Sequence, residues 1–196
     1  RDTNWSEEQI FSMVRQLSSE ERLSVLSSLV DHDDVMMVSL AFFELGQLYI
    51  EAQDESHREA IISEIIKAEQ SPYGYARIGM SRSLVKVLNH SNHKGHIQLS
   101  LEVLCLTLAR YDDGLHEHYI LDLAKYFPKI EDESLKPLIV GSFFKFYTEL
   151  KVRRGAFVAW ESIIELVKSS DDLEFSLGIL DKVFDDPMPY TLAWQL

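Results

Sequence analysis

Hydrophobic and polar residues alternate with the helical period along nearly the whole chain. Between residues 19 and 30, for example, Leu23, Leu26 and Val30 share one stripe, because residues three or four apart lie on the same side of a helix. No segment has the shorter period that is typical of a strand. We therefore expect an all-α fold with helices at 6–17, 19–30, 34–50, 56–69, 73–88, 95–110, 114–126, 134–150, 155–167 and 172–184.

Two of the expected helices begin with a pattern that caps helix N-termini. Ser6 is followed three residues later by Gln9, and Ser18 by Glu21. In this spacing the serine and the Gln or Glu side chains satisfy each other's backbone N–H groups. The pattern supports helix starts close to residues 6 and 19.

Short polar breaks recur along the chain at a regular interval. They lie just before Asp34, Tyr73, Gly114 and Gly155, about forty residues apart. This is the period of repeats that are built from two helices. A single helix pair cannot bury its apolar face alone, so the repeats are expected to stack on a continuous core.

The first break and the helix after it have a distinctive order of residues. The sequence LSSLVDHDDV at 26–35 is followed by Ala41 and by LGQL at 45–48. The acids can cap the next helix, while Ala41 and Gly46 allow a neighbouring helix to approach closely. This segment resembles the turn and second helix of a HEAT repeat, of the armadillo type. The resemblance implies an α–α superhelix, a HEAT-like solenoid with about four helix pairs plus capping helices.

We accordingly predict one HEAT-like repeat domain over residues 1–196. Later breaks match less well, since Arg153 and Arg154 replace the acids at the fourth. A different pairing of the helices and a non-repetitive helical bundle remain alternatives. The C-terminal tail either covers the last repeat or docks a partner. The expected parts are repeats at 19–50, 56–88, 95–126 and 134–167, caps at 6–17 and 172–184, and the tail at 185–196.

The charge of the chain is large and uneven. The formal net charge is −13, with −10 in residues 1–69 and +4 in residues 70–111. A protein this acidic attracts basic partners and is repelled at long range by nucleic acids and anionic membranes. The alternative is that the charge serves solubility alone.

The HEAT resemblance implies that the second helix of each pair lines a concave face where partners bind. Arg, Tyr, Trp and Phe are favoured at the centres of interfaces. Within 73–88 we expect a buried stripe of Ala76, Met80, Leu84 and Val87, with Tyr75, Gly79, Arg82 and Lys86 opposite. The alternative is that the charges are solvated and the aromatics belong to the core. The predicted binding residues are Phe43, Gln47, Tyr75, Arg82, Lys86, His118, Asp122, Arg153, Arg154 and Trp160.

Candidate chemistry is sparse in the sequence. His90, His93 and His96 are weak candidates for metal ligands, because Lys94 interrupts them and few acids lie nearby in sequence. The single cysteine, Cys105, lies in an apolar segment and is expected to be buried. Phosphate-binding loops, nucleophile elbows and zinc-protease motifs are not found. We therefore expect no metal, no cofactor and no enzymatic activity.

These observations favour a non-catalytic protein-binding module, either an adaptor or a stoichiometric, immunity-type inhibitor of a basic partner protein. One alternative is a nucleic-acid-binding protein that uses the central basic stripe, like the HEAT-like DNA-alkylation-repair glycosylases. Another is a protein-modifying enzyme like the HEAT-like bilin lyases. The longest apolar run is too short for a membrane helix, so we expect no membrane contact and a cytoplasmic location.

Overall fold

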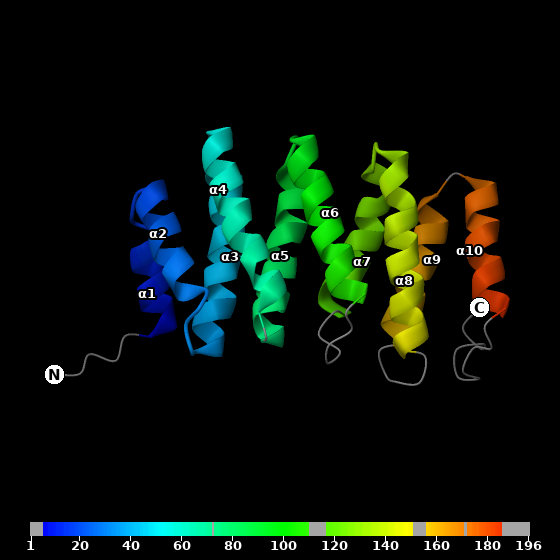
Figure 1. Cartoon of the computed structure of the whole chain (residues 1–196), viewed down its shortest axis with the longest axis horizontal. Helices are drawn as coiled ribbons and strands as arrows, with labels where there is room; N and C mark the ends of the chain where they lie inside the picture. Colours follow the sequence, from blue (N-terminus) through cyan, green and yellow to red (C-terminus); the bar gives the residue numbers. More distant parts are fainter. Residues whose placement is uncertain (1–5, 72, 110–116, 151–155, 171, 186–196) are drawn as a thin grey trace. The chain divides into compact units, whose positions relative to one another are not determined.

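The structure is a computed structural model that describes residues 6–71, 73–109, 117–150, 156–170 and 172–185. Within these ranges it contains ten α-helices, three short 3-10 helices and no strand (Figure 1). The prediction of an all-α fold is confirmed. No helix among the described residues has the length and apolar character needed to cross a lipid bilayer.

The helices follow the expected order, and their boundaries among the described residues agree with the expected ones within three residues. The expected segment 56–69 ends in the 3-10 helix η1 (Lys67–Gln70). The start expected at residue 114 lies outside the described residues. The α-helices are α1 (Glu7–Val14), α2 (Ser19–Leu29), α3 (Val35–Glu51), α4 (Glu55–Ile66), α5 (Gly74–His90), α6 (Lys94–Ala109), α7 (Glu117–Tyr126), α8 (Lys136–Leu150), α9 (Ala156–Ser169) and α10 (Leu173–Asp185).

The predicted capping residues are confirmed. The backbone N–H of Ser6 donates to the Gln9 side chain at 2.9 Å, and Ser18 and Glu21 form the second capping box. At the start of α3 the Asp34 carboxylate accepts hydrogen bonds from the backbone N–H groups of Met36 (2.8 Å) and Met37 (3.2 Å). These contacts satisfy donors that a helix N-terminus leaves unpaired.

Replacing Asp34 with alanine is expected to lower the free energy of unfolding by about 1 kcal/mol, because two N–H donors of α3 lose their acceptor. Equilibrium denaturation in urea measures the change. Asp33→Ala, one residue before the cap, is the control and should change stability by less than about 0.5 kcal/mol. Equal losses in the two variants would show that acidity of the turn, and not the cap, stabilises this helix.

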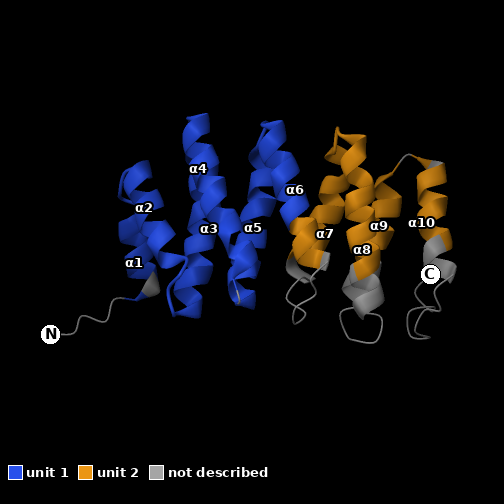
Figure 2. Ribbon diagram, viewed as in Figure 1, with its two compact units in different colours: residues 1–103 blue, residues 104–196 orange. Residues whose placement is uncertain are grey.

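The chain divides into two compact units, residues 1–103 and residues 104–196 (Figure 2). The boundary falls inside α6, so it is not a linker between helices. The expectation of one repeat domain over the whole chain stays a prediction. Each unit is described by itself below.

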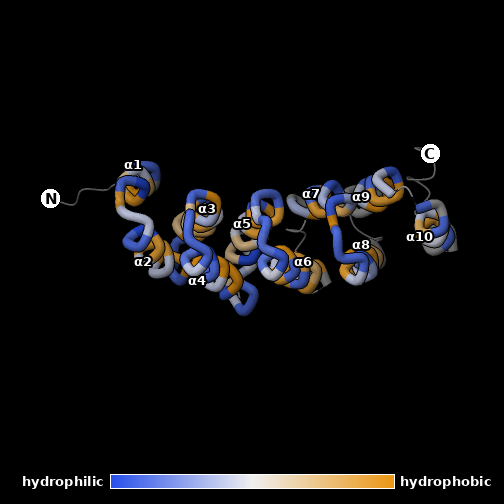
Figure 3. Tube along the Cα trace, turned by 90° about the horizontal axis from the view of Figure 1, so that it is seen from above, coloured by the Kyte–Doolittle hydropathy of each residue, from blue (hydrophilic) through white to orange (hydrophobic). Residues whose placement is uncertain are grey.

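In the first unit the helices alternate between two layers. Figure 3 shows α1, α3 and α5 in one layer and α2 and α4 in the other. The most extensive packing joins α3 to α5, and α2 and α4 pack against α3 from the second layer. The predicted buried stripe of α5, made of Ala76, Met80, Leu84 and Val87, is confirmed. This alternation agrees with stacked helix pairs in either pairing phase.

Helices α3 and α5 approach closely because each presents a glycine to the other. A Cβ atom on Gly46 would lie 3.1 Å from the Cα of Ser83, and one on Gly79 would lie 2.8 Å from the Cβ of Phe42. The Ser83 hydroxyl shares its proton between two backbone carbonyls. One is that of Phe42 on the neighbouring helix α3, and the other is that of Gly79 on its own helix. The role expected for Gly46 is confirmed. The expectation that Gly79 lies opposite the buried stripe is wrong, because this glycine is buried against α3.

A network of charged side chains around the buried Glu44 links α1 and α2 to α3. Glu44 is 1% exposed and accepts hydrogen bonds from the guanidinium of Arg15, which follows α1. Arg22 of α2 lies 3.8 Å from the second Glu44 oxygen and donates to Glu51 at 2.5 Å. Hydrogen bonding to Arg22 lowers the pKa of Glu51. A buried acid is tolerated here because two cations face it.

In the second unit α9 is the central helix. It packs against α7, α8 and α10. The rings of Phe127, after α7, and Phe175, on α10, stack with centroids 5.3 Å apart. Cys105 is buried near the start of this unit, as expected. The core also contains Tyr119, Ile120, Leu123, Phe143, Ile163 and Leu166.

Candidate functional site

Five of the predicted binding residues lie on the adjacent helices α3 and α5. They form what we call the α3–α5 face: Phe43 and Gln47 from α3, and Tyr75, Arg82 and Lys86 from α5. Phe43 is 45% exposed and Arg82 is also exposed, whereas the other three are half-buried. This face lies beside the tight contact made by Gly46 and Gly79, so a rigid helix pair supports it.

The centre of the α3–α5 face is a cation on an aromatic ring. The ammonium of Lys86 lies 3.5 Å from the centroid of the Phe43 ring and donates to the Phe43 carbonyl at 3.3 Å. Burial lowers the pKa of Lys86, while the nearby carboxylate of Glu44 acts in the opposite direction. Two contacts on one residue hold the lysine against α3. The exposed edge of Phe43 remains open to a partner.

Aromatic and apolar side chains extend this face toward the start of both helices. Met36, about half-exposed, lies two turns before Phe43 on α3. The rings of Tyr73 and Tyr75 stack with centroids 5.2 Å apart. Met36 and Tyr73 were not among the predicted residues, although the spacing of seven residues between Met36 and Phe43 places both on one helix side.

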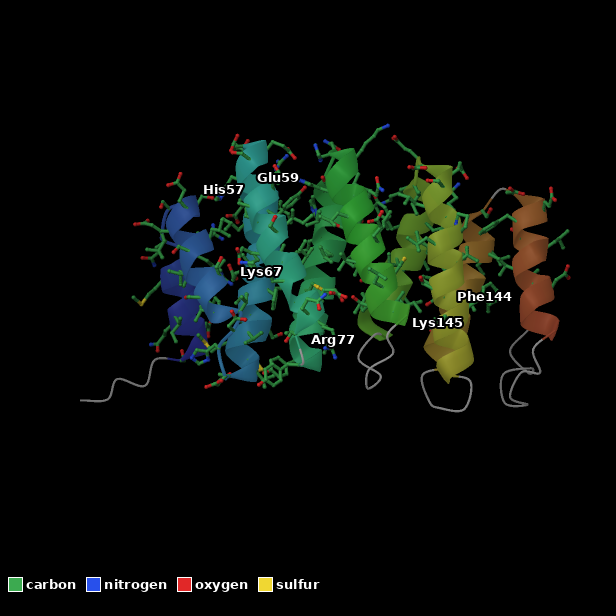
Figure 4. All side chains as sticks on the ribbon, in the orientation of Figure 1. His57, Glu59, Lys67, Arg77, Phe144 and Lys145 are labelled. Atoms are coloured by element: carbon green, nitrogen blue, oxygen red, sulfur yellow. The ribbon has the colours of Figure 1, made fainter. Side chains whose placement is uncertain are left out.

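A hollow of about 310 Å³ opens beneath the two tyrosines. It lies between the end of α2, the first turns of α3, η1 and the start of α5. Figure 4 shows Lys67 and Arg77 on the elements that border it. Its lining includes Val30, His32, Phe42, Tyr73, Tyr75 and Ala76. The hollow is large enough to receive one or two side chains of a docked polypeptide.

The remaining predicted binding residues belong to the second unit. Asp122 is exposed on α7. His118 and Trp160 lie in α7 and α9, but their side chains are outside the described part of the chain. Arg153 and Arg154 lie outside the described residues altogether. These five predictions therefore stay untested.

The three candidate histidines separate in the structure. His90 ends α5, is exposed, and has its Nδ1 atom 2.9 Å from the carbonyl of Lys86. His93 and His96 instead meet Glu55, the first residue of α4. One possible ligand atom from each of these three residues lies within 4.8 Å of the others. Sequence reasoning missed Glu55 because nearly forty residues separate it from the histidines.

The Glu55–His93–His96 cluster combines an exposed and a buried side. Oε1 of Glu55 lies 3.3 Å from Nδ1 of His96 and 3.8 Å from Nδ1 of His93. The two imidazole rings have centroids 4.4 Å apart. His96 is only 5% exposed. Burial, and next the neighbouring His93, lower the pKa of His96 below its usual value, so this ring is neutral at neutral pH.

Tyr49 of α3 and Ser91, which follows α5, hold His96 from its buried side. The hydroxyl of Tyr49 lies 2.8 Å from Nδ1 of His96 and donates to the hydroxyl of Ser91, also at 2.8 Å. Ser91 in turn accepts the backbone N–H of His93 at 3.1 Å. The short segment between α5 and α6 is therefore tied to the buried tyrosine.

A comparison with models of protein families finds none that matches this chain. A search of curated proteins finds no match either. The resemblance to HEAT repeats therefore stays a prediction from the sequence, and the structure itself shows an all-α fold that is compatible with a helical repeat protein.

Proposed function

We propose that this chain is a non-catalytic protein-binding module of the HEAT-like solenoid kind, which acts as an adaptor or a stoichiometric inhibitor of a basic partner protein. The observation that supports this proposal is the centre of the α3–α5 face. There, a half-exposed aromatic ring carries a lysine ammonium at 3.5 Å. Phenylalanine is enriched in protein interfaces, and tyrosine and arginine, which Tyr75 and Arg82 supply to this face, are enriched among the residues that dominate binding energy.

The rigidity of the supporting helices favours binding. Gly46 and Gly79 hold α3 and α5 in direct contact, and the Ser83 hydroxyl bonds across that contact. A partner that docks on a preformed surface orders few groups on this side of the interface. The entropy lost on association is correspondingly small.

Acidic side chains at both ends of α3 favour a partner with basic residues. Asp33 and Asp34 precede the helix, Glu51 is its last residue and Asp54 lies three residues further on; all four are exposed. The partner segment that fits this face has an apolar residue for Met36 and Phe43 and basic residues toward both ends. Attraction of this kind accelerates association and weakens as salt is added.

The first test is capture of stoichiometric partners from the native host extract at low and at high salt. We expect one basic protein in near-equal amount, lost at high salt. The affinity for that purified protein is then measured with Phe43→Ala and with Met36→Ala, which remove the two half-exposed apolar side chains of this face. Each should bind more weakly, Phe43→Ala by at least about tenfold, while circular dichroism shows an unchanged helical content.

The control for these variants is Leu177→Ala, which removes another half-exposed apolar side chain, from α10. It should leave the affinity unchanged. Recovery of nucleic acid in place of a protein, or full affinity in both α3–α5 variants, would contradict the proposal.

A further inference from the structure

We propose that Glu55, His93 and His96 form a binding site for a divalent transition-metal ion, with Zn²⁺ as the expected occupant. The three residues offer one carboxylate oxygen and two imidazole nitrogens, and α4 and the start of α6 bring them together. Imidazole nitrogen together with one carboxylate is a donor set that Zn²⁺ accepts, whereas Mg²⁺ and Ca²⁺ prefer oxygen alone.

The spacing of the donor atoms suits a tetrahedral ion. Bonds of about 2.0–2.1 Å to zinc place neighbouring donor atoms about 3.3 Å apart. Oε1 of Glu55 lies 3.3 Å from Nδ1 of His96 and 3.8 Å from Nδ1 of His93. The second distance is longer than this spacing, and the exposed side chain of His93 would have to rotate toward Glu55 when the ion binds. These two side chains are about half-exposed, so water completes the coordination.

Each donor is held in place by a neighbour. The second oxygen of Glu55, Oε2, lies 3.7 Å from the guanidinium of Arg58, which leaves Oε1 for the ion. Nδ1 of His93 accepts a long hydrogen bond, 3.4 Å, from the backbone N–H of His96, so this nitrogen carries a lone pair. On His96, the donor atom Nδ1 also lies 2.8 Å from the hydroxyl of Tyr49, which donates its own proton to Ser91. Nδ1 therefore carries the ring proton in the metal-free protein and loses it when the ion binds.

The surrounding charge includes groups of both signs. Glu59 lies one turn after Glu55 on α4, and Figure 4 shows Glu59 and His57 together at this end of the helix. The negative charge of Glu59 acts to raise the pKa of His96, whereas the positive charge of Arg58 acts to lower it. The ion would replace the proton on Nδ1 of His96, which faces the carboxylate of Glu55 and the hydroxyl oxygen of Tyr49.

An ion at this point would cross-link two helices. Glu55 is the first residue of α4, whereas His93 and His96 lie just before and within the first turn of α6. A ligand that binds the folded state alone raises the stability of that state. We therefore expect Zn²⁺ to stabilise the first unit.

The test is titration of the full chain, first freed of metal with a chelator, with Zn²⁺ alone in a calorimeter. We expect one ion per chain at micromolar affinity and a melting temperature that rises with Zn²⁺. His93→Ala and Glu55→Gln should each weaken binding at least tenfold and remove the thermal shift. Because His93→Ala also loses the capping contact with the backbone N–H of His96, the thermal shift of each variant is measured against its own melting temperature without metal.

His90→Ala is the matched control, since this histidine is exposed in the same region but lies outside the cluster. It should bind Zn²⁺ as the wild type does. No saturable binding by the wild-type chain would overturn the proposal. Binding that survives His93→Ala and Glu55→Gln, or that His90→Ala weakens equally, would overturn it as well.

Discussion

Replacing Glu44 with alanine is expected to lower the free energy of unfolding by about 3 kcal/mol. Its carboxylate is almost fully buried and accepts hydrogen bonds from Arg15, and Arg22 lies on its other side. Without the Glu44 carboxylate, the buried guanidinium of Arg22 faces one anion, Glu51, where it had two. The missing side chain also leaves a cavity between α3 and the helices α1 and α2. Removing one member of a buried ion pair is costly because the other charge stays in a medium of low polarity.

Equilibrium denaturation in urea, followed by circular dichroism, measures the effect of Glu44→Ala. The control is Glu133→Ala, which removes an acid from an ion pair with Lys136, because the Glu133 side chain is 77% exposed and water solvates the remaining lysine. This control should lose less than about 1 kcal/mol. If both variants lost equal stability, the burial of Glu44 would not be the source of the energy.

The second large effect is expected from Gly79→Ala, which should lower the free energy of unfolding by about 2 kcal/mol. The new Cβ atom would lie 2.8 Å from the Cβ of Phe42. That atom is next to the backbone and cannot rotate away, so α3 and α5 must separate. This cost exceeds the gain of about 1 kcal/mol that alanine normally brings to a helix.

The same substitution should have the opposite sign at Gly178. Gly178 lies within α10, and a Cβ atom placed there meets nothing within 4 Å. Gly178→Ala should therefore raise stability by about 0.5–1 kcal/mol, and Gly141→Ala in α8 provides a second example. Thermal and urea unfolding of the three variants compare them directly. A Gly79→Ala protein more stable than the wild type would show that α3 and α5 can move apart at little cost.

The parts of the fold that could be predicted from sequence depend on local chemistry. Ser6, Ser18 and Asp34 cap their helices through residues two or three positions away, so their roles are visible in the sequence itself. Helical periodicity likewise identified the buried stripe of α5. Gly46 could be assigned because a glycine between apolar helix positions signals close packing.

The parts that could not be predicted depend on which helices meet. Gly79, Arg82 and Lys86 are three and four residues apart, so the sequence predicts that they lie on one surface of the helix. The sequence alone does not show that α3 covers the part of this surface that contains Gly79. Glu55 reaches His93 and His96 only through the packing of α4 beside the start of α6. The contact of Lys86 with Phe43 also follows from helix packing, although both residues were predicted for one binding surface.

The contact between Arg15 and Glu44 determines what must break when α1 detaches from α3. Segments that bury few contacts open locally at a lower free-energy cost than the unfolding of the whole structure. Helix α1 has eight residues, and the Arg15–Glu44 contact follows it directly. Brief detachment of α1 would therefore break one ion pair and leave α3 and α5 interlocked. Hydrogen exchange in α1 would then report this local opening, while exchange in α3 would report the unfolding of the whole first unit.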